Sequence, residues 1–190
     1  ISKITIKGFK SIRCLEDFEL RNLNILIGPN GAGKSNFISF FQLLRDMAKG
    51  QFQAFVGREG GADRVFYLGS KVTDELAGSV WAGTARMFWK FKIFSSKTNE
   101  LFFFEEEVGD GSSTLSTKWA KEFDHGLRES TLFTEGGQEH DEYVQKIKDV
   151  IQPIMESWVG YHFHDTSDFA KVKLPYTKRD YEYLYSDARN

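Results

Sequence analysis

The sequence has very little cysteine, no long apolar run and almost no net charge, and each shortage excludes a class of protein. The single cysteine, Cys14, excludes an internal disulfide and fits a reducing compartment. No run reaches the roughly 18 apolar residues that a membrane helix needs, and the alternating start ISKITIKGFKS lacks the apolar block of a signal peptide. The net charge of −2 gives no overall attraction to nucleic acid or to an anionic membrane. We therefore expect a soluble, cytoplasmic protein without membrane contact, in which any polyanion contact comes from a local patch.

Three short segments near the N-terminus predict strands. Residues 3–9 (KITIKGF) alternate apolar and polar side chains, which is the pattern of a half-buried strand. Residues 17–20 (DFEL) predict a short second strand after a break at FKSI. The run LNILI at 23–27 is nearly continuous apolar, which predicts a central strand covered on both faces.

A strongly apolar helix is predicted directly after the third strand. Its apolar residues recur at helical spacing and cover most of its surface, so we expect it to be packed inside layers. Lys49-Gly50 supplies a C-terminal stop. The apolar residues of this helix are Phe37, Ile38, Phe40, Phe41, Leu43, Leu44 and Met47.

The middle of the chain is β-rich and then polar. The glycine-rich residues 51–80 are expected to be loop with a short strand or two. Residues 85–96 and 101–111 predict a hairpin, whereas 112–140 are polar and poorly patterned.

The last part of the chain predicts one helix and one strand. Residues 142–158 place apolar side chains on one helical stripe, and Pro153 is expected to kink or break this helix. The segment VGYHFHD at 159–165 predicts a strand, and a charged, tyrosine-rich tail follows at 171–190. The stripe consists of Val144, Ile147, Val150, Ile151, Ile154 and Met155.

The stretch GPNGAGKS at 28–35 matches the phosphate-loop pattern G-x-x-x-x-G-K-[ST] in full. Glycines allow backbone torsions that let successive N–H groups turn around a phosphate, and the following helix adds its positive N-terminus. Lys34 is placed to reach the β- and γ-phosphates, Ser35 to bind Mg²⁺, and Asn36 to lie nearer the α-phosphate. A structural glycine turn is the alternative, but a strand before and a helix after the loop are the context that the motif requires. The predicted ATP-binding residues of the loop are Gly28, Asn30, Gly31, Ala32, Gly33, Lys34, Ser35 and Asn36.

The residues around the loop carry a resemblance to a known family. The strand ITIKGFKSI followed by LNILIGPNGAGKSNFISFF resembles the RecF/SMC-like branch of the ABC-type ATPases, and VGYHFHDTS at 159–167 looks like a segment of bacterial AAA-family ATPases of that branch. The resemblance covers residues 1–50 and 155–170. It implies a β-rich first lobe bearing the phosphate loop, a second lobe with the signature motif, and ATP held between two head domains. It also implies that Lys10 and Ser11 lie near the base, ribose or phosphates, although a solvated turn explains them equally well.

The sequence departs from this family after residue 35. It contains no signature serine-glycine motif and no apolar strand ending in Asp-Glu. Residues 102–105 (FFFE) imitate the latter and leave Glu105 as a candidate metal-side acid, although the hairpin setting and the following Glu106, Glu107 and Val108 favour a charged strand end. We expect the chain to be the N-terminal portion of a longer ATPase whose second lobe is absent. Such a fragment would bind nucleotide weakly at best and would not hydrolyse it.

Two histidines and an aspartate near the C-terminus are further candidates. His162 and His164 share one face of the predicted strand and Asp165 lies on the other, so the histidines could share a metal, but no third ligand is evident. The family's topology offers another role. In those ATPases the strand that leads out of lobe one ends near the γ-phosphate, and a glutamine there contacts Mg²⁺ and the attacking water. His164 or Asp165 could take that place as catalytic residues. A histidine hydrogen-bonded at a sheet edge is the structural alternative.

A basic cluster lies at the N-terminus. Lys3, Lys7, Lys10 and Arg13 could neutralise DNA phosphates, but such a cluster in a nearly neutral chain is also typical of a solvated face.

Together these observations predict an α/β (mixed α+β) P-loop NTPase with an ABC-ATPase-like lobe one, in which a β-rich subdomain surrounds a buried phosphate-loop helix. A single domain would span 1–190: strand-strand-loop-helix over 1–50, a β-rich segment over 51–111, and helix, strand and tail over 112–190. The expected function is ATP- and Mg²⁺-dependent head dimerisation and hydrolysis that acts on DNA or a partner effector, as in DNA repair, chromosome maintenance or phage defence. The alternatives are a P-loop small-molecule kinase and a non-catalytic interaction fragment.

Overall fold

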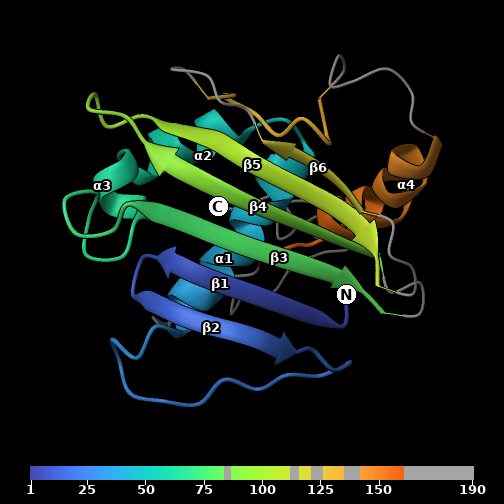
Figure 1. Cartoon of the computed structure of the whole chain (residues 1–190). Coiled ribbons are helices and arrows are strands. Elements are labelled where there is room, and N and C mark those ends of the chain that lie inside the picture. Colours follow the sequence, from blue (N-terminus) through green and yellow to red (C-terminus); the bar gives the residue numbers. More distant parts are fainter. Residues whose placement is uncertain (84–86, 112–115, 121–125, 135–141, 161–190) are drawn as a thin grey trace, which may run out of the picture. The chain divides into compact units, whose positions relative to one another are not determined.

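The computed structural model describes residues 1–83, 87–111, 116–120, 126–134 and 142–160. They form a mixed α/β fold, and residues 1–157 belong to one compact unit (Figure 1). No helix within these ranges is long and apolar enough to cross a membrane. The strands are β1 (Lys3–Phe9), β2 (Ile12–Glu19), β3 (Glu75–Ala82), β4 (Met87–Ser95), β5 (Leu101–Asp110) and β6 (Ser116–Ala120). The helices are α1 (Lys34–Ala48), α2 (Phe52–Glu59), α3 (Ala62–Val65) and α4 (Glu142–Glu156).

The six strands form one antiparallel sheet in the order β2-β1-β3-β4-β5-β6. The predicted strand 3–9 is confirmed as β1, and the predicted hairpin is confirmed as β4 and β5. The second strand is longer than predicted because only Lys10 and Ser11 separate β1 from β2. This two-residue turn brings Lys10 and Ser11 to one end of the sheet.

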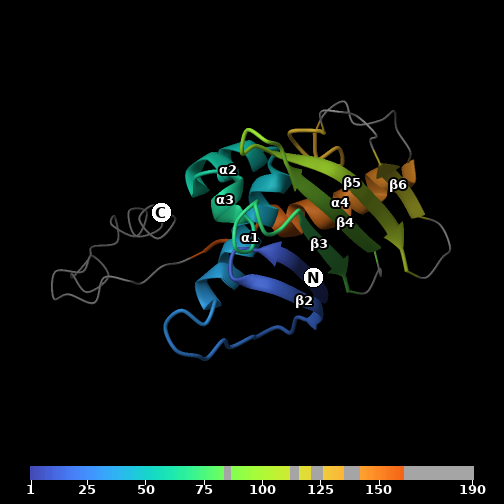
Figure 2. The same ribbon diagram turned by 60° about the vertical axis from the view of Figure 1, so that its left-hand side comes forward.

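Helix α1 packs against one face of the sheet (Figures 1 and 2). Alternation along β1 buries Ile4 and Ile6 completely, and the Phe9 and Phe40 rings meet edge to face with their centroids 5.4 Å apart. Gly78 on β3 makes this packing possible, because a Cβ there would lie 3.1 Å from the Phe40 ring and 2.4 Å from the Phe91 ring. The sheet and α1 therefore share one core.

The predicted phosphate-loop helix is confirmed, with its end at Ala48 and its C-cap at Lys49, but it is not enclosed on all sides. Ile38 remains 40% exposed and Phe41 is half-buried. Among the described elements α4, α2 and β1 contact α1, yet part of its apolar surface stays open. The buried apolar residues of α1 are Phe37, Phe40, Leu43, Leu44, Met47 and Ala48.

The prediction that residues 23–27 form a central strand is wrong for this structure. Residues 20–29 have no regular secondary structure and run outside the sheet, beyond its edge strand β2 (Figures 1 and 2). The described strands are all antiparallel and offer no parallel neighbour to this run. Its large side chains are consequently exposed: Leu23 74%, Ile25 73%, Leu26 38% and Ile27 92%.

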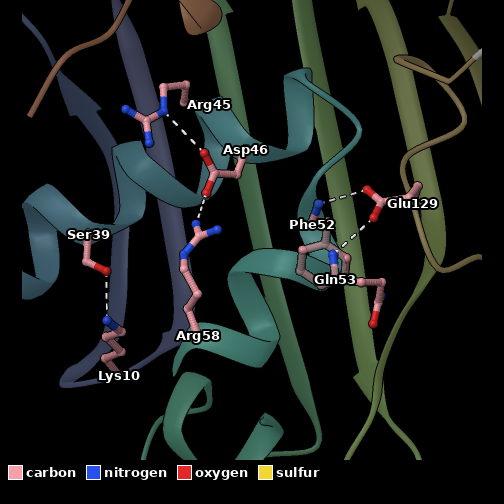
Figure 3. Close-up of polar contacts among 8 residues, drawn as sticks. All are labelled: Lys10, Ser39, Arg45, Asp46, Phe52, Gln53, Arg58 and Glu129. Carbon is pink, nitrogen blue, oxygen red and sulfur yellow. Dashed lines mark hydrogen bonds and ion pairs between the residues drawn. The ribbon is translucent and has the colours of Figure 1, made fainter. Parts of the chain in front are cut away.

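The prediction of loop with a short strand or two over 51–80 is confirmed for a strand, since most of β3 lies there, but it missed the helices α2 and α3. Phe52, Phe55 and Val56 have the helical i, i+3, i+4 spacing and are buried. The Glu129 carboxylate accepts the N–H groups of Phe52 and Gln53 at 2.9 and 3.0 Å, which satisfies the first turn of α2 (Figure 3).

Helix α4 confirms the predicted helix and continues through Pro153 to Glu156, so the proline does not break it. Ile147, Ile151 and Met155 are fully buried, in agreement with the predicted stripe. Of the predicted strand 159–165, only 159 and 160 are described, and they are not in a strand; the rest and the tail 171–190 lie outside the described residues.

Candidate nucleotide-phosphate site

The glycines of the phosphate loop adopt the backbone conformation that the motif requires. Gly31 and Gly33 have φ of 84° and 89°, in the left-handed region that favours glycine. At Gly33 a side chain is also excluded by space, since a Cβ would lie 2.8 Å from the Ser11 hydroxyl oxygen. Alternation of such residues with ordinary ones makes a concave set of N–H groups that suits an anion.

The loop amides are free for a ligand. Within residues 28–33, all of which the structure describes, only the N–H of Ala32 donates to another backbone group, the Pro29 carbonyl at 3.2 Å. The first turn of α1 carries no acidic residue, and Gly33 has no side chain to cap it. The positive end of a 15-residue helix therefore lies at the loop without a neutralising neighbour from the helix itself.

Lys34 lies over its own loop. Its ammonium donates to the carbonyl oxygens of Gly28 and Pro29, each at 2.7 Å. These contacts hold the cation at the start of the loop, next to the free amides. The Ser35 side chain is exposed, so its hydroxyl is open to a cation from solvent.

The turn between β1 and β2 contacts the first two turns of α1. The Asn36 amide nitrogen donates to the Ser11 hydroxyl at 2.7 Å, which places both predicted residues beside the loop. The Lys10 ammonium donates to Ser39 at 2.7 Å (Figure 3). It also pairs with Glu59 at 2.8 Å. The Lys10 side chain is only 15% exposed, so two protein partners already engage its charge.

An ion pair links α1 to α2 behind this turn. Asp46 on α1 is almost fully buried and accepts from Arg45 at 3.2 Å and from Arg58 on α2 (Figure 3). Arg58 is 58% exposed, but the Asp46 side chain is only 3% exposed. Loss of Arg58 would therefore leave the buried Asp46 charge with Arg45 alone, so the contact helps to hold α2 against α1. The turn, α1 and α2 therefore support the loop as one unit.

A pocket of about 600 Å³ opens beside Ser11 and Asn36. Its far side comes from the segment after α2, which the sequence analysis gave no functional role. The glycines in that segment were the available indication, since Gly60, Gly61 and Gly69 all have positive φ and mark tight turns. The far side consists of Asp63, Arg64, Phe66, Leu68, Gly69 and Lys71.

The acidic residues of β5 are not arranged as a metal site. The Glu105 and Glu107 carboxylates pair with Lys92 at 3.7 Å and Lys90 at 3.2 Å on β4. The described residues contain no group of three His, Cys, Asp or Glu side chains that could hold a metal ion. The sequence FFFE therefore lies within a paired strand, with β3 and β4 between it and β1. His162, His164 and Asp165 lie outside the described residues.

Most of the basic N-terminal cluster is already paired. Lys3 contacts Asp17 at 2.9 Å, Lys7 contacts Glu16, and Lys10 contacts Glu59. The hydrogen bond with Glu16 raises the pKa of Lys7. These pairs agree with the solvated-face interpretation of the cluster.

Comparison with known proteins adds one match. No curated protein matches the chain. Residues 23–78 match the family model described as "AAA domain, putative AbiEii toxin, Type IV TA system". The match covers less than a third of the chain, but it includes the whole phosphate loop, α1 and the far side of the pocket. Over residues 23–78 the chain is therefore similar to an AAA-type P-loop ATPase domain, a class that binds nucleotides.

Proposed function

We propose that this chain is the ATP-binding part of a RecF/SMC-like ABC-type ATPase, with ATP and Mg²⁺ bound by residues 28–36. The observation that carries the proposal is the loop itself. Two left-handed glycines and unpaired N–H groups lie at the uncapped start of a helix whose body is fixed in the core. The match over residues 23–78 supports the nucleotide-binding part of this proposal.

Each loop residue would have a separate role. The N–H groups from Asn30 to Gly33 would donate to phosphate oxygens. Lys34 would exchange its two carbonyl acceptors for phosphate oxygens, which are charged and therefore stronger acceptors. The exposed Ser35 hydroxyl fits a ligand of Mg²⁺, which would neutralise charge on the β- and γ-phosphates.

The remaining steps need groups beyond the loop. In the proposed mechanism His164 or Asp165 would orient the attacking water, and a second lobe would supply the signature motif. Two heads would then close around ATP and reopen after hydrolysis, acting on DNA or on a partner effector. DNA repair, chromosome maintenance and phage defence are the proposed settings, and the toxin in the matched family's description favours testing defence first.

The decisive experiment compares alanine substitutions of two lysines: Lys34, the first residue of α1, and Lys49, the C-cap of the same helix. We expect Lys34→Ala to abolish ATP binding in calorimetric titrations with Mg²⁺, because it removes the cation beside the loop amides while leaving the buried core intact. Lys49→Ala, at the exposed opposite end, is the matched control and should bind ATP like the wild type. Equal ATP affinity in the two variants would contradict the assignment.

The same titration separates the alternatives. Tight ATP binding by a monomer that transfers phosphate to a small molecule would favour the kinase. An absence of nucleotide binding by the wild type would favour an interaction fragment.

A further inference from the structure

The phosphate loop contains an asparagine that is followed directly by a glycine. Asn30-Gly31 is the one Asn-Gly pair in the sequence. We propose that this pair is a modification site, at which Asn30 deamidates spontaneously and the added negative charge ends ATP binding, whereas a bound nucleotide protects the pair. The deamidation itself does not depend on the proposed function, but the loss of ATP binding and the protection rest on it.

Deamidation begins when the backbone nitrogen of the next residue attacks the side-chain carbon of the asparagine, so access to that nitrogen controls the rate. Gly31 leaves it open, because a Cβ on this residue would meet no atom within 4 Å. Its N–H donates to no group of the described chain. The Asn30 side chain is exposed and forms no hydrogen bond with a described residue. Both reacting groups are therefore free.

The turn around the pair is weakly closed. The Ala32 N–H donates to the Pro29 carbonyl at 3.2 Å, at the long end of the usual range, and Gly31 has φ of 84°, as the third residue of a type II turn does. This is the only backbone hydrogen bond that an N–H of residues 28–33 donates. Rotation of the Asn30 backbone, which brings the Gly31 nitrogen to the side chain, therefore disturbs little of the fold.

Other asparagines near the loop lack this freedom. The Asn24 side chain donates to the Arg21 carbonyl at 2.7 Å and accepts the Arg21 N–H at 3.1 Å. The Asn36 amide nitrogen donates to the Ser11 hydroxyl at 2.7 Å. Each is followed by a residue with a bulky side chain, which crowds the attacking nitrogen. Asn24 is thus an internal reference for Asn30.

The reaction needs only water. The Gly31 nitrogen gives its proton to hydroxide and attacks Cγ of Asn30. The Cγ–Nδ2 bond breaks, and the side-chain nitrogen takes a proton from water and leaves as ammonia, which regenerates the hydroxide. Water then opens the resulting cyclic imide at Cγ, to give aspartate, or at the backbone carbonyl carbon, to give isoaspartate. In sum, water is consumed, ammonium is released, and a neutral amide becomes a carboxylate.

A carboxylate at residue 30 would oppose the charge on which the loop depends. The first turn of α1 carries no acidic residue, so the helix end and the loop amides favour an anion. Lys34 donates to the Pro29 carbonyl at 2.7 Å, immediately before Asn30. A carboxylate there would attract this ammonium and repel a triphosphate. In isoaspartate an additional backbone carbon would also displace the Gly31 N–H.

A bound nucleotide would block the attack. In the proposed function the N–H groups from Asn30 to Gly33 donate to phosphate oxygens, so the Gly31 nitrogen keeps its proton and cannot turn toward the Asn30 side chain. The phosphates also repel the hydroxide that removes this proton. Deamidation is therefore a reaction of the nucleotide-free loop.

The first test follows residue 30 in the whole chain by peptide mass mapping during incubation in mildly alkaline buffer, with and without ATP and Mg²⁺. Exchange of an amide for a carboxylate raises the mass, whereas isomerisation of the Asp110-Gly111 pair does not change it. We expect residue 30 to convert well before Asn24 in the same sample. ATP with Mg²⁺ should slow the conversion of residue 30.

Variants test the consequence for the loop in calorimetric titrations with ATP and Mg²⁺. Asn30→Asp, the direct product, should bind ATP roughly a hundredfold more weakly than freshly prepared wild type. Asn22→Asp adds the same charge at an exposed residue outside the loop and should bind ATP like the wild type. Asn30→Gln would need a larger ring, which forms more slowly. It should keep its own initial affinity through an incubation in which the wild type loses affinity.

The outcomes separate this inference from the proposed function. Conversion of residue 30 no faster than that of Asn24 would overturn the modification site. Wild-type affinity in Asn30→Asp would reject its effect on the loop. Equal conversion with and without ATP, in a wild type that binds ATP, would reject the protection. If freshly prepared wild type binds no ATP, the proposed function fails together with the loss of binding and the protection, whereas early conversion of residue 30 would still establish the modification site.

Discussion

Among the charged side chains of β1 to β5, Glu106 is the most deeply buried, with 3% exposure. Trp89 Nε1–H donates to its carboxylate at 3.1 Å, Thr131 N–H donates at 2.6 Å, and the Ser130 hydroxyl donates as well. These bonds tie residues 130–131 to β5. Burial raises the pKa of Glu106 from its ordinary 4.5, and the hydrogen bonds from Ser130, Thr131 and Trp89 oppose that shift without cancelling it.

This raised pKa predicts a specific pH dependence of stability. The folded state holds the proton more tightly than the unfolded state, so the contribution of Glu106 is complete below pH 4.5 and is lost as the pH rises through the folded pKa. In urea unfolding series from pH 4.5 upward, the wild type should therefore lose stability relative to Glu106→Gln, which cannot titrate. Glu107→Gln, on the more exposed face of the same strand, serves as the control. Parallel curves for wild type and Glu106→Gln would contradict the prediction.

At the scale of elements, the structure shows what the sequence could predict and what it could not. Strand β1, helix α1 and the β4–β5 hairpin were predictable because local periodicity and the core agree there. Helix α2 was missed because three glycines in residues 57–61 favoured a loop, whereas burial of Phe52 and Phe55 and the distant Glu129 carboxylate stabilise a helix. No local pattern could reveal a cap supplied from more than 70 residues away.

The candidate site likewise has one part that could be predicted from the sequence and one part that could not. The phosphate loop is contiguous in sequence, so its residues could be named from the motif. The far side of the pocket is not contiguous with the loop, because Asp63 and Leu68 join Asn36 at the pocket through the fold. Hydrogen bonds from Lys10 N–H to Val65 and from Tyr67 N–H to Gly8 hold their segment beside β1 and its turn. The prediction of a strand over residues 23–27 was wrong although these residues are contiguous. Their apolar pattern suits a strand only where neighbouring strands cover it, and the described sheet does not offer such neighbours.

The exposure of residues 23–27 predicts that substitutions of two isoleucines differ in their effect on the free energy of unfolding. Ile27 is 92% exposed and Ile6 is fully buried on β1. We expect Ile27→Thr to change the free energy of unfolding by less than about 0.5 kcal/mol, and to reduce binding of a hydrophobic dye. Ile6→Ala should cost about 2–5 kcal/mol through the cavity it leaves. Urea unfolding and dye fluorescence measure both effects, and a large loss of stability in Ile27→Thr would show that the segment is buried in solution.

At the scale of the whole molecule, the proposed ATP sandwich needs both a phosphate loop and a signature motif. The loop of one head would face the signature motif of another, and the 190 residues contain no such motif. Nucleotide-driven association is therefore predicted for the protein with both lobes, whereas this chain alone should bind ATP without pairing through it. The exposed segment 23–27 introduces a second, nucleotide-independent route to self-association, because it presents apolar side chains and free backbone groups to solvent.

Light scattering with and without a non-hydrolysable ATP analogue can separate these two routes. In the two-lobed protein, the analogue with Mg²⁺ should shift the mass from one copy to two, and Lys34→Ala should remove that shift because it removes the cation beside the loop amides. Association through residues 23–27 should instead persist in Lys34→Ala and weaken in Ile27→Thr. A two-lobed protein that stays monomeric with the analogue, while binding it through Lys34, would keep the nucleotide site and reject the ABC-type dimer. The phosphate loop and the sandwich are thus separate claims, and only the first depends on the geometry of residues 28–36.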